Sequence, residues 1–288
     1  MREISILIPT YNDECVRLAA TLQQQAQSLG IAYEIIVADD GSTNRDVIER
    51  NRDINQLPHC QLIERPKNAG RAAIRNFLAR QARHEWLLFI DGDMVVCHED
   101  YIRRYAEAQG EVVDGGVVIR HCRPRNLRSM YEKAHEHEHV AEKRQQTPYQ
   151  DFHTANFMIR RTLFLAHPFD ERFQHYGYED VLFGKTLQQD HIDIIHIDNP
   201  MSFERFEENG LFVSKTEEGL RTLWHFREEL KGYSRMLDFR ERIGRLAPLL
   251  RLWHQVFGHL ERRIACSTHP SLRVFDLYRI GYFISMKQ

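Results

Sequence analysis

Two clusters of acidic residues follow short apolar runs in the N-terminal third of the chain. Asp39 and Asp40 precede a Gly-Ser pair, and Asp91, Gly92 and Asp93 form an Asp-x-Asp sequence. Because Asp and Gly favour turns, either cluster alone is typical of an ordinary turn. An Asp-x-Asp turn can also hold a hard cation through its oxygens and leave sites for water and phosphate. Such a cation neutralises charge on a departing diphosphate, so the two clusters together indicate metal and nucleotide chemistry.

A third acidic pair, Glu179 and Asp180, follows the aromatic-glycine sequence His-Tyr-Gly-Tyr at residues 175–178. A positioned carboxylate can take the proton from a hydroxyl group as that group attacks a substrate. The same two acids also suit the first turn of a helix, where the helix dipole favours negative charge. The two interpretations are compatible, because residues 181–183 are typical of the start of a helix.

Near-continuous apolar runs at residues 4–8, 34–38 and 86–90 lead into polar or acidic residues. Runs of this kind predict strands that are buried on both faces of a mostly parallel sheet. Residues 14–29 and 69–82 have helical periodicity and lie between these strands. The alternation predicts an α/β fold with right-handed crossovers, in which ligands lie beyond the carboxyl ends of the strands.

The second half of the chain is less regular. Residues 117–120, 157–160 and 192–197 resemble further strands, and the pattern is helical from about residue 215 onward. We therefore expect a catalytic domain over residues 1–210 and a C-terminal helical extension over residues 211–288.

The composition excludes several classes of protein. The 288 residues include 39 Lys and Arg and 41 Asp and Glu, so the net charge of -2 gives no general attraction to nucleic acid. The five cysteines form no Cys-x-x-Cys pair, which argues against a disulfide framework or a structural zinc site. The first strand is not followed by Gly-x-Gly-x-x-Gly, and there is no Gly-Lys-Ser/Thr loop. These absences argue against a dinucleotide site and a phosphate-loop nucleotidase.

Membrane-directed segments are also not evident. The apolar run at residues 4–9 is too short for a signal peptide, and no run approaches the roughly 18–20 apolar residues that span a bilayer. We therefore expect a cytoplasmic protein. Residues 240–263 alternate Leu, Trp and Phe with Arg, which fits either a helix packed on the catalytic domain or peripheral contact with the inner face of an anionic membrane.

Four motifs occur in an order that resembles the family-two inverting glycosyltransferases, which are nucleotide-diphospho-sugar transferases with a GT-A fold. They are Pro-Thr-Tyr-Asn at residues 9–12, Val-Ala-Asp-Asp-Gly-Ser at 37–42, Asn-x-Gly-x₅-Asn at 68–76 and Asp-Gly-Asp at 91–93. The sequence at residues 175–181 is similar to that family's Glu-Asp motif. The resemblance covers residues 3–210. It implies a hexosyl- or N-acetylhexosaminyl-transferase that moves a sugar, expected from a UDP-sugar, to a hydroxyl of a saccharide or lipid-linked saccharide.

The resemblance also implies donor-binding roles. Pro9, Tyr11 and Asp39 would border the nucleobase, and Asp39 would accept a hydrogen bond from a ring N–H. Asn68 and Arg71 would lie near the nucleotide.

The remaining roles concern the cation and the reaction. Asp91 would meet the ribose or the metal, and Asp93 would ligate a divalent cation, Mn²⁺ or Mg²⁺. Asp180 would be the catalytic base, with Glu179 beside it in the acceptor pocket.

One position departs from the family pattern. Related sequences follow Asp-Asn-Pro, here residues 198–200, with a histidine that can ligate the metal. The matching position in this chain is Phe203, which cannot coordinate a cation. The metal would then depend on Asp93, phosphates and water. His196 lies nearby, and its place within an apolar run favours a packed core residue.

His135, His137 and His139 suggest a second metal site. On a helix, however, residues 135 and 139 share a face and residue 137 does not. The surrounding acids and lysines favour a solvated helix.

Two other functions remain open. A nucleotidyltransferase also uses paired acids and a metal on an α/β sheet, but it would usually carry a Gly-rich basic loop where this chain has residues 9–12. A catalytically weak nucleotide-sugar-binding protein is the other alternative, because Phe203 replaces the expected histidine.

Overall fold

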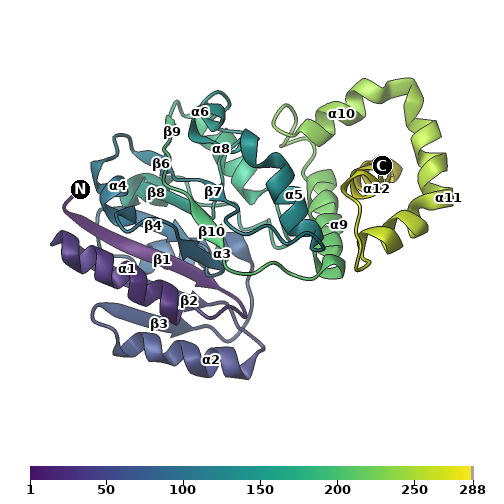
Figure 1. The fold of residues 1–288 in the computed structure, drawn as a ribbon. Helices are drawn as coiled ribbons and strands as arrows, with labels where there is room; N and C mark the ends of the chain where they lie inside the picture. The colour runs from purple at the N-terminus through teal and green to yellow at the C-terminus, as the bar shows by residue number, and fades with distance from the viewer. Residues whose placement is uncertain (287–288) are drawn as a thin grey trace.

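The computed structural model describes residues 1–286. Figure 1 shows a central sheet flanked by helices, with a group of helices at the far end of the molecule. Within these residues the main sheet has seven strands in the order β3-β2-β1-β4-β8-β6-β9. In chain order they are β1 (Glu3–Thr10), β2 (Ala32–Asp39), β3 (Cys60–Glu64), β4 (Trp86–Ile90), β6 (Val112–Asp114), β8 (Asn156–Arg160) and β9 (Ile194–His196).

The sheet is mostly parallel, as predicted. Parallel pairs join β1 to β2 and β4, β2 to β3, and β6 to β9, whereas β8 runs antiparallel to β4 and β6. Residues 117–120 do not join this sheet. They contribute β7 (Val117–Val118) to a three-stranded sheet in which β10 (Met201–Phe203) lies between β7 and β5 (Met94–Val96). The sequence pattern found β7 but missed β3, β5, β6 and β10, because these strands are too short to show periodicity.

The helices of the first 208 residues lie between these strands, singly or in pairs. They are α1 (Val16–Leu29), α2 (Arg45–Asn51), α3 (Arg71–Gln81), α4 (Tyr101–Glu107), α5 (Leu127–His135), α6 (Ala141–Arg144), α7 (Arg161–Ala166) and α8 (Glu179–Gln189). The predicted helices at residues 14–29 and 69–82 correspond to α1 and α3.

The apolar runs are continuous because the sheet is buried on both faces. In β1, Ile6 and Ile8 belong to one core cluster with Leu22 of α1, whereas Leu7 belongs to a second cluster with Leu78 of α3. Successive residues of a strand point to opposite faces, so both faces need apolar side chains. This packing holds the carboxyl ends of β1 and β2 side by side, with Thr10 opposite Asp39.

From residue 209 onward the described chain is helical, which confirms the predicted C-terminal helical region. Its helices are α9 (Asn209–His225), α10 (Arg235–Ile243), α11 (Ala247–Ala265) and α12 (Leu272–Ser285). One apolar cluster joins Phe173 to Leu220 of α9 and Phe283 of α12, and another joins Leu127 of α5 to Phe275 of α12. Residues 287–288 of the expected extension lie outside the described residues.

Among residues 1–286, no helix combines the length and the apolar character needed to cross a bilayer.

Candidate active site

A cleft of about 240 Å³ opens at the carboxyl ends of β1 and β4. Its lining comes from the loops after those strands, the start of α3, the helices α5 and α9, and the loop before α8. The residues that line it are Pro9, Thr10, Tyr11, Asp13, Asp40, Asn68, Gly70, Arg71, Ile74, Arg75, Asp91, Gly92, Asp93, Arg128, Tyr176 and Lys215.

Hydrogen bonds connect the loop after β1 to the loop after β2. The backbone N–H of Asn12 donates to Ser42 Oγ over 2.7 Å, and Ser42 N–H donates to Asp39 Oδ1 over 2.8 Å. Gly41 has a φ of +73°, and a Cβ there would come within 2.8 Å of backbone atoms of Lys67 and Asn68. Only glycine fits this turn without moving the backbone.

Asp40 fixes the start of α3. One of its carboxylate oxygens accepts from Arg65 over 2.8 Å, and the other accepts from the backbone N–H groups of Ala69 and Gly70, each over 3.0 Å. Asp40 therefore holds the turn that places Arg71 at the edge of the cleft.

Two arginines of α3 link the cleft to the Glu-Asp pair. The guanidinium of Arg75 is buried and is ion-paired with Asp91, and its Nη1 lies 3.7 Å from Glu179. Arg71 lies 3.9 Å from Glu179 and covers the ring of Tyr176 at 4.6 Å from the centroid. Burial raises the pKa of the Glu179 carboxyl, and so does the charge of Asp180, while the two arginines oppose that shift.

One side of the cleft, which we name the acidic wall, is formed by Asp13, Asp91 and Asp93. Burial, followed by the negative charge of Asp91, raises the pKa of Asp93. Burial and the charge of Asp93 raise the pKa of Asp13 to about 6. Sequence reasoning missed Asp13, although it directly follows the Pro-Thr-Tyr-Asn motif at residues 9–12.

Another part of the lining, which we name the basic wall, is formed by Arg128 of α5 and Lys215 of α9. Both form ion pairs with Glu207, and the Lys215–Glu207 distance is 3.3 Å. Lys215 also lies 5.8 Å from the centroid of the Tyr176 ring. Neither cation belongs to a recognisable motif, so only the fold brings them to the cleft.

Phe203 does lie beside the Asp-x-Asp turn. It pairs with Met94 in the small sheet, and the next residue, Glu204, donates its N–H to the backbone oxygen of Asp93 over 2.9 Å. The guanidinium of Arg128 covers the Phe203 ring at 4.4 Å from the centroid. The position of the expected histidine is therefore occupied by an aromatic ring that supports a cation.

The donor set for a metal is small. Within residues 1–286, no group of three or more His, Cys, Asp or Glu side chains is arranged to hold a cation. Asp91 is already paired with Arg75, which leaves Asp93 as the carboxylate of the turn that is free to bind. These residues fit a divalent cation only when diphosphate oxygens and water complete its coordination.

The structure brings six of the predicted donor and metal residues together. Pro9, Tyr11, Asn68, Arg71, Asp91 and Asp93 all line the cleft. Asp39 lies just beneath it and is only 3% exposed, while its neighbour Asp40 reaches the lining. The predicted nucleobase contact of Asp39 stays a prediction.

Glu179 and Asp180 form the first turn of α8, which begins two residues earlier than the sequence pattern indicated. Asp180 Oδ1 accepts from the backbone N–H of Val181 over 2.8 Å. Gly177 and Tyr178 before them both have positive φ values, +92° and +69°. Neither acid lines the cleft itself, but Glu179 contacts two arginines that do.

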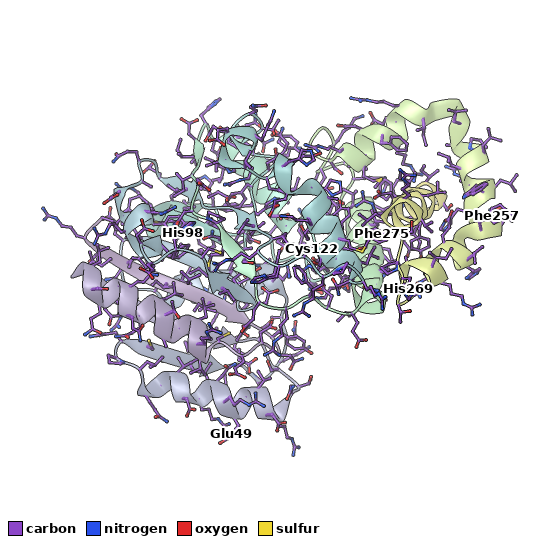
Figure 2. All side chains as sticks on the ribbon, viewed as in Figure 1. Glu49, His98, Cys122, Phe257, His269 and Phe275 are labelled. Carbon is purple, nitrogen blue, oxygen red and sulfur yellow. The ribbon has the colours of Figure 1, made fainter. Side chains whose placement is uncertain are left out.

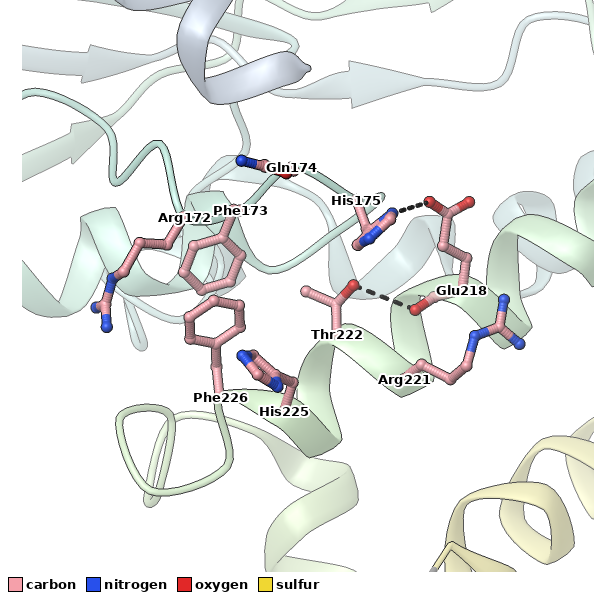
Figure 3. A pocket seen from close by; sticks show the side chains of 9 residues that line it. All are labelled: Arg172, Phe173, Gln174, His175, Glu218, Arg221, Thr222, His225 and Phe226. Atoms are coloured by element: carbon pink, nitrogen blue, oxygen red, sulfur yellow. Dashed lines mark hydrogen bonds and ion pairs between the residues drawn. The ribbon is translucent and has the colours of Figure 1, made fainter. Parts of the chain in front are cut away.

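A second cavity of about 500 Å³ lies next to the loop that carries Tyr176. Figure 3 shows it between residues 172–175 and α9. The second cavity is lined by Arg172, Phe173, Gln174, His175, Glu218, Arg221, Thr222, His225 and Phe226. Glu218 of this cavity contacts the loop that also lines the cleft. Its Oε1 accepts from the backbone N–H of Tyr176 over 3.2 Å and lies 3.3 Å from His175 Nδ1.

The histidines considered as metal ligands, at positions 135, 137, 139 and 196, do not line the cleft. His196 is buried, with Nδ1 at 2.6 Å from Arg144 and Nε2 at 2.9 Å from the carbonyl oxygen of Pro148, as expected for a packed core residue. Helix α5 ends at His135, and a 3-10 turn over Glu136–Glu138 follows it, so His135 and His139 do not share one continuous helix face.

Comparison with known families decides the affiliation of this fold. The model of glycosyl transferase family 2 matches residues 5–167, more than half of the chain. The chain belongs to glycosyl transferase family 2.

Sequence relatives match this chain over only part of their lengths. The Escherichia coli chondroitin synthase is 28% identical over 244 residues, which cover 70% of this chain and 34% of that protein. An uncharacterized glycosyltransferase of Haemophilus influenzae is 32% identical over 99 residues, which cover 33% of this chain and 38% of the relative. The chain thus spans about a third of the length of these curated relatives.

Solved structures support the GT-A fold. Staphylococcus aureus TarS 1–349 in complex with UDP-GlcNAc superposes with a TM-score of 0.54 at 16% identity, and the match covers 96% of this chain and 89% of that chain. Glucosyl-3-phosphoglycerate synthase from Mycobacterium tuberculosis, in complex with Mn²⁺, UDP and phosphoglyceric acid, gives a TM-score of 0.50 at 17% identity, with coverage of 77% and 78%. At these identities the likeness establishes the fold alone.

Proposed function

We propose that the chain is an inverting glycosyltransferase that moves a sugar from a UDP-sugar to a hydroxyl of a saccharide or lipid-linked saccharide. The observation that carries this proposal is the cleft, which is lined by both an acidic wall and a basic wall at the carboxyl ends of the parallel strands. A nucleotide-diphospho-sugar presents the matching groups, because its diphosphate can bind both a cation held by carboxylates and the side chains of Arg and Lys.

Donor binding is assigned to the first half of the chain. Pro9, Tyr11 and Asp39 border the nucleobase, and Asn68 and Arg71 approach the nucleotide from the start of α3. The bonds from Asp40 to the turn before α3 hold this segment in place.

A divalent cation would be held by Asp93 together with the donor. When bound, Mn²⁺ or Mg²⁺ neutralises negative charge on the departing diphosphate. Asp91 is assigned to the ribose, because its contact with Arg75 already holds its carboxylate in one orientation.

Asp180 is proposed as the base that takes the proton from the acceptor hydroxyl. The acceptor oxygen attacks the anomeric carbon from the face opposite the diphosphate, the bond to the diphosphate breaks, and the configuration inverts. Glu179 is proposed to position the site through Arg71 and Arg75. The second cavity, behind the same loop, offers room for further sugar units of the acceptor.

The test is a release assay. Wild-type protein incubated with UDP-sugars and Mn²⁺ should release UDP, faster when an acceptor is added. Release of inorganic diphosphate from a nucleoside triphosphate would instead identify a nucleotidyltransferase, and binding without any release would identify a nucleotide-sugar-binding protein.

A second measurement examines the nucleobase contact. Asp39→Ala should weaken UDP binding by about 1–3 kcal/mol, the typical effect of losing a hydrogen bond to a charged group. Calorimetry with UDP measures this directly, and an unchanged Kd would remove Asp39 from the donor site.

We also propose that residues 211–288 form an extension that contacts an anionic membrane surface through α11. Figures 1 and 2 place α11, with Phe257, at the end of the molecule away from the seven-stranded sheet. Leu249, Leu252, Val256 and Leu260 of this helix are between 55% and 63% exposed. Their spacing of three and four residues puts them on one face, as in interfacial helices.

The charges beside that face favour a lipid surface over a second copy of the chain. Arg263 follows Leu260 by three residues on the same side of α11, is exposed, and forms no ion pair within the described part of the chain. Arg251 lies on the other side of α11, where its Nε donates to the carbonyl oxygen of Ile284 over 3.0 Å. The carboxylate of Glu261 on α11 is buried and accepts from Trp253. A face that presents an unpaired cation would repel its own copy but attract anionic headgroups.

A further inference from the structure

The basic wall has a feature that the motifs do not explain: an arginine lies on an aromatic ring where a metal ligand is expected. The Arg128 guanidinium lies 4.4 Å from the centroid of the Phe203 ring, and its side chain is only 13% exposed. Contact with an aromatic face stabilises a guanidinium in a fixed orientation. Arg128 is therefore held in place before any ligand binds.

Arg128 and Lys215 face the cleft, whereas their shared partner does not. Both cations line the cleft and both pair with Glu207, which is not among the lining residues. A second acid, Glu132, lies 3.8 Å from Arg128, and burial raises its pKa. Burial works against the charge on Arg128, yet Glu207 raises the pKa of Arg128, so the guanidinium stays protonated.

The acidic wall carries the matching negative charge. The charge of Arg128 reaches Asp93, because it lowers the pKa of that carboxyl against the larger effect of burial. A diphosphate bound between Asp93 and Arg128 would meet a forked donor that can bind two phosphate oxygens at once. Lys215 would add a second positive charge on the same side.

We infer that Arg128 and Lys215 form a diphosphate subsite in which Arg128 is stacked on Phe203. Nucleoside diphosphates would then bind this chain without a divalent cation. This inference rests on the proposed function and assigns part of the expected metal's role to the chain itself. Phe203 then has a functional role. Where related chains have a metal ligand, its ring instead holds the guanidinium of Arg128 in place.

The experiment compares UDP with uridine by calorimetry in EDTA and in Mn²⁺, with GDP as a second nucleotide. In EDTA the wild type should bind UDP at least about 10-fold more tightly than uridine. Arg128→Gln should weaken UDP binding in EDTA by about 10- to 100-fold, as expected for lost charged hydrogen bonds, and should leave uridine binding unchanged. Arg123→Gln is the matched control, because Arg123 is exposed and lies outside the cleft.

A second variant covers the case in which Arg128→Gln does not fold. Phe203→Leu keeps every charge and removes the aromatic face, and it should weaken UDP binding in EDTA by about 2- to 5-fold. Equal binding of UDP and uridine in EDTA would overturn the inference. So would identical Kd values for Arg128→Gln and Arg123→Gln, or an unchanged Kd for Phe203→Leu.

The same titrations separate this inference from the proposed function. Binding of UDP that requires Mn²⁺ would contradict the inference and leave the proposed function standing. Failure of UDP and GDP to bind in either buffer would contradict both.

Discussion

The acidic wall and the basic wall of the cleft differ in how the chain builds them. Asp13, Asp91 and Asp93 all follow the ends of neighbouring parallel strands, β1 and β4. Arg128 and Lys215 come from α5 and α9, which are far apart in sequence and meet through side-chain packing of Leu127 against Val213. Strand order alone places the acids, whereas the cations depend on the docking of the helical extension.

The two walls also differ in how their charges are balanced. Burial raises the pKa values of Asp13 and Asp93, and repulsion between the carboxylates of the acidic wall adds to this effect. The cations of the basic wall share a buried carboxylate, Glu207. The acidic wall is therefore the one that gains most from a bound cation, and the basic wall is prepared for an anion without one.

The largest expected effect belongs to Asp180, which is part of neither wall. Asp180→Asn keeps the size of the side chain but removes the basic carboxylate, so turnover should fall by about 100- to 10,000-fold. The Kd for UDP should stay the same, because the residue does not line the cleft. Turnover is measured as UDP release with a saturating donor.

Glu179→Gln is the matched control for that substitution. It sits next in the chain, but its carboxylate faces Arg71 and Arg75, so its loss should change donor affinity more than the proton-transfer step. If the Glu179 variant is inactive while the Asp180 variant works normally, the two roles are reversed. If both variants keep full activity, the base lies elsewhere.

The contrast between the walls explains how far the sequence could predict the site. Asp91 and Asp93 were found because a buried strand followed by acids is a local pattern. Arg128 and Lys215 have no such pattern, and their role depends on contacts with Phe203 and Glu207 that only the fold creates. The same limit applies to the sheet, where the three-residue strand β6 is too short to show periodicity.

Asp93→Asn sharpens the comparison by disabling only the acidic wall. It should lower Mn²⁺-dependent turnover by about 100-fold, because the cation loses its protein carboxylate. Binding of UDP in EDTA should change by less than about 2-fold, since the basic wall is intact. Turnover against Mn²⁺ concentration and calorimetry in EDTA measure the two effects, and a variant with an unaltered Mn²⁺ response would take Asp93 out of the metal site.

The acidic wall should also make the stability of the ligand-free protein depend on pH. Asp13 holds its proton up to a pKa of about 6 in the folded state, whereas the unfolded chain releases it near 3.8. Between these values the folded state binds more protons, so the free energy of unfolding should fall as pH rises from about 4 to about 6. The loss would be at most about 3 kcal/mol.

Urea unfolding in EDTA across this pH range measures the slope. Asp13→Asn should flatten it and should stabilise the ligand-free protein at pH 7, because no charge is then buried beside Asp93. Parallel curves for the variant and the wild type would show that Asp13 is already well solvated.

The smallest expected effect concerns α11, whose exposed face lies outside both walls. The wild type should sediment with anionic vesicles at low salt and be released as salt screens the arginines, each worth about 1 kcal/mol near the surface. A double substitution, Leu249→Asp with Val256→Asp, should reduce binding by about 10-fold through lost apolar contact. Sedimentation with vesicles of phosphatidylserine and phosphatidylcholine measures this.

Leu165→Asp is the matched control for the double substitution, because Leu165 is also an exposed apolar residue but lies on α7, away from the extension. It should bind vesicles as the wild type does, and all variants should keep the same UDP affinity. That second readout matters because α9 supplies Lys215 to the cleft, so a misfolded extension would lose nucleotide binding as well. Absence of vesicle binding by the wild type at low salt would leave α11 as a helix packed on α12, with no role at a membrane.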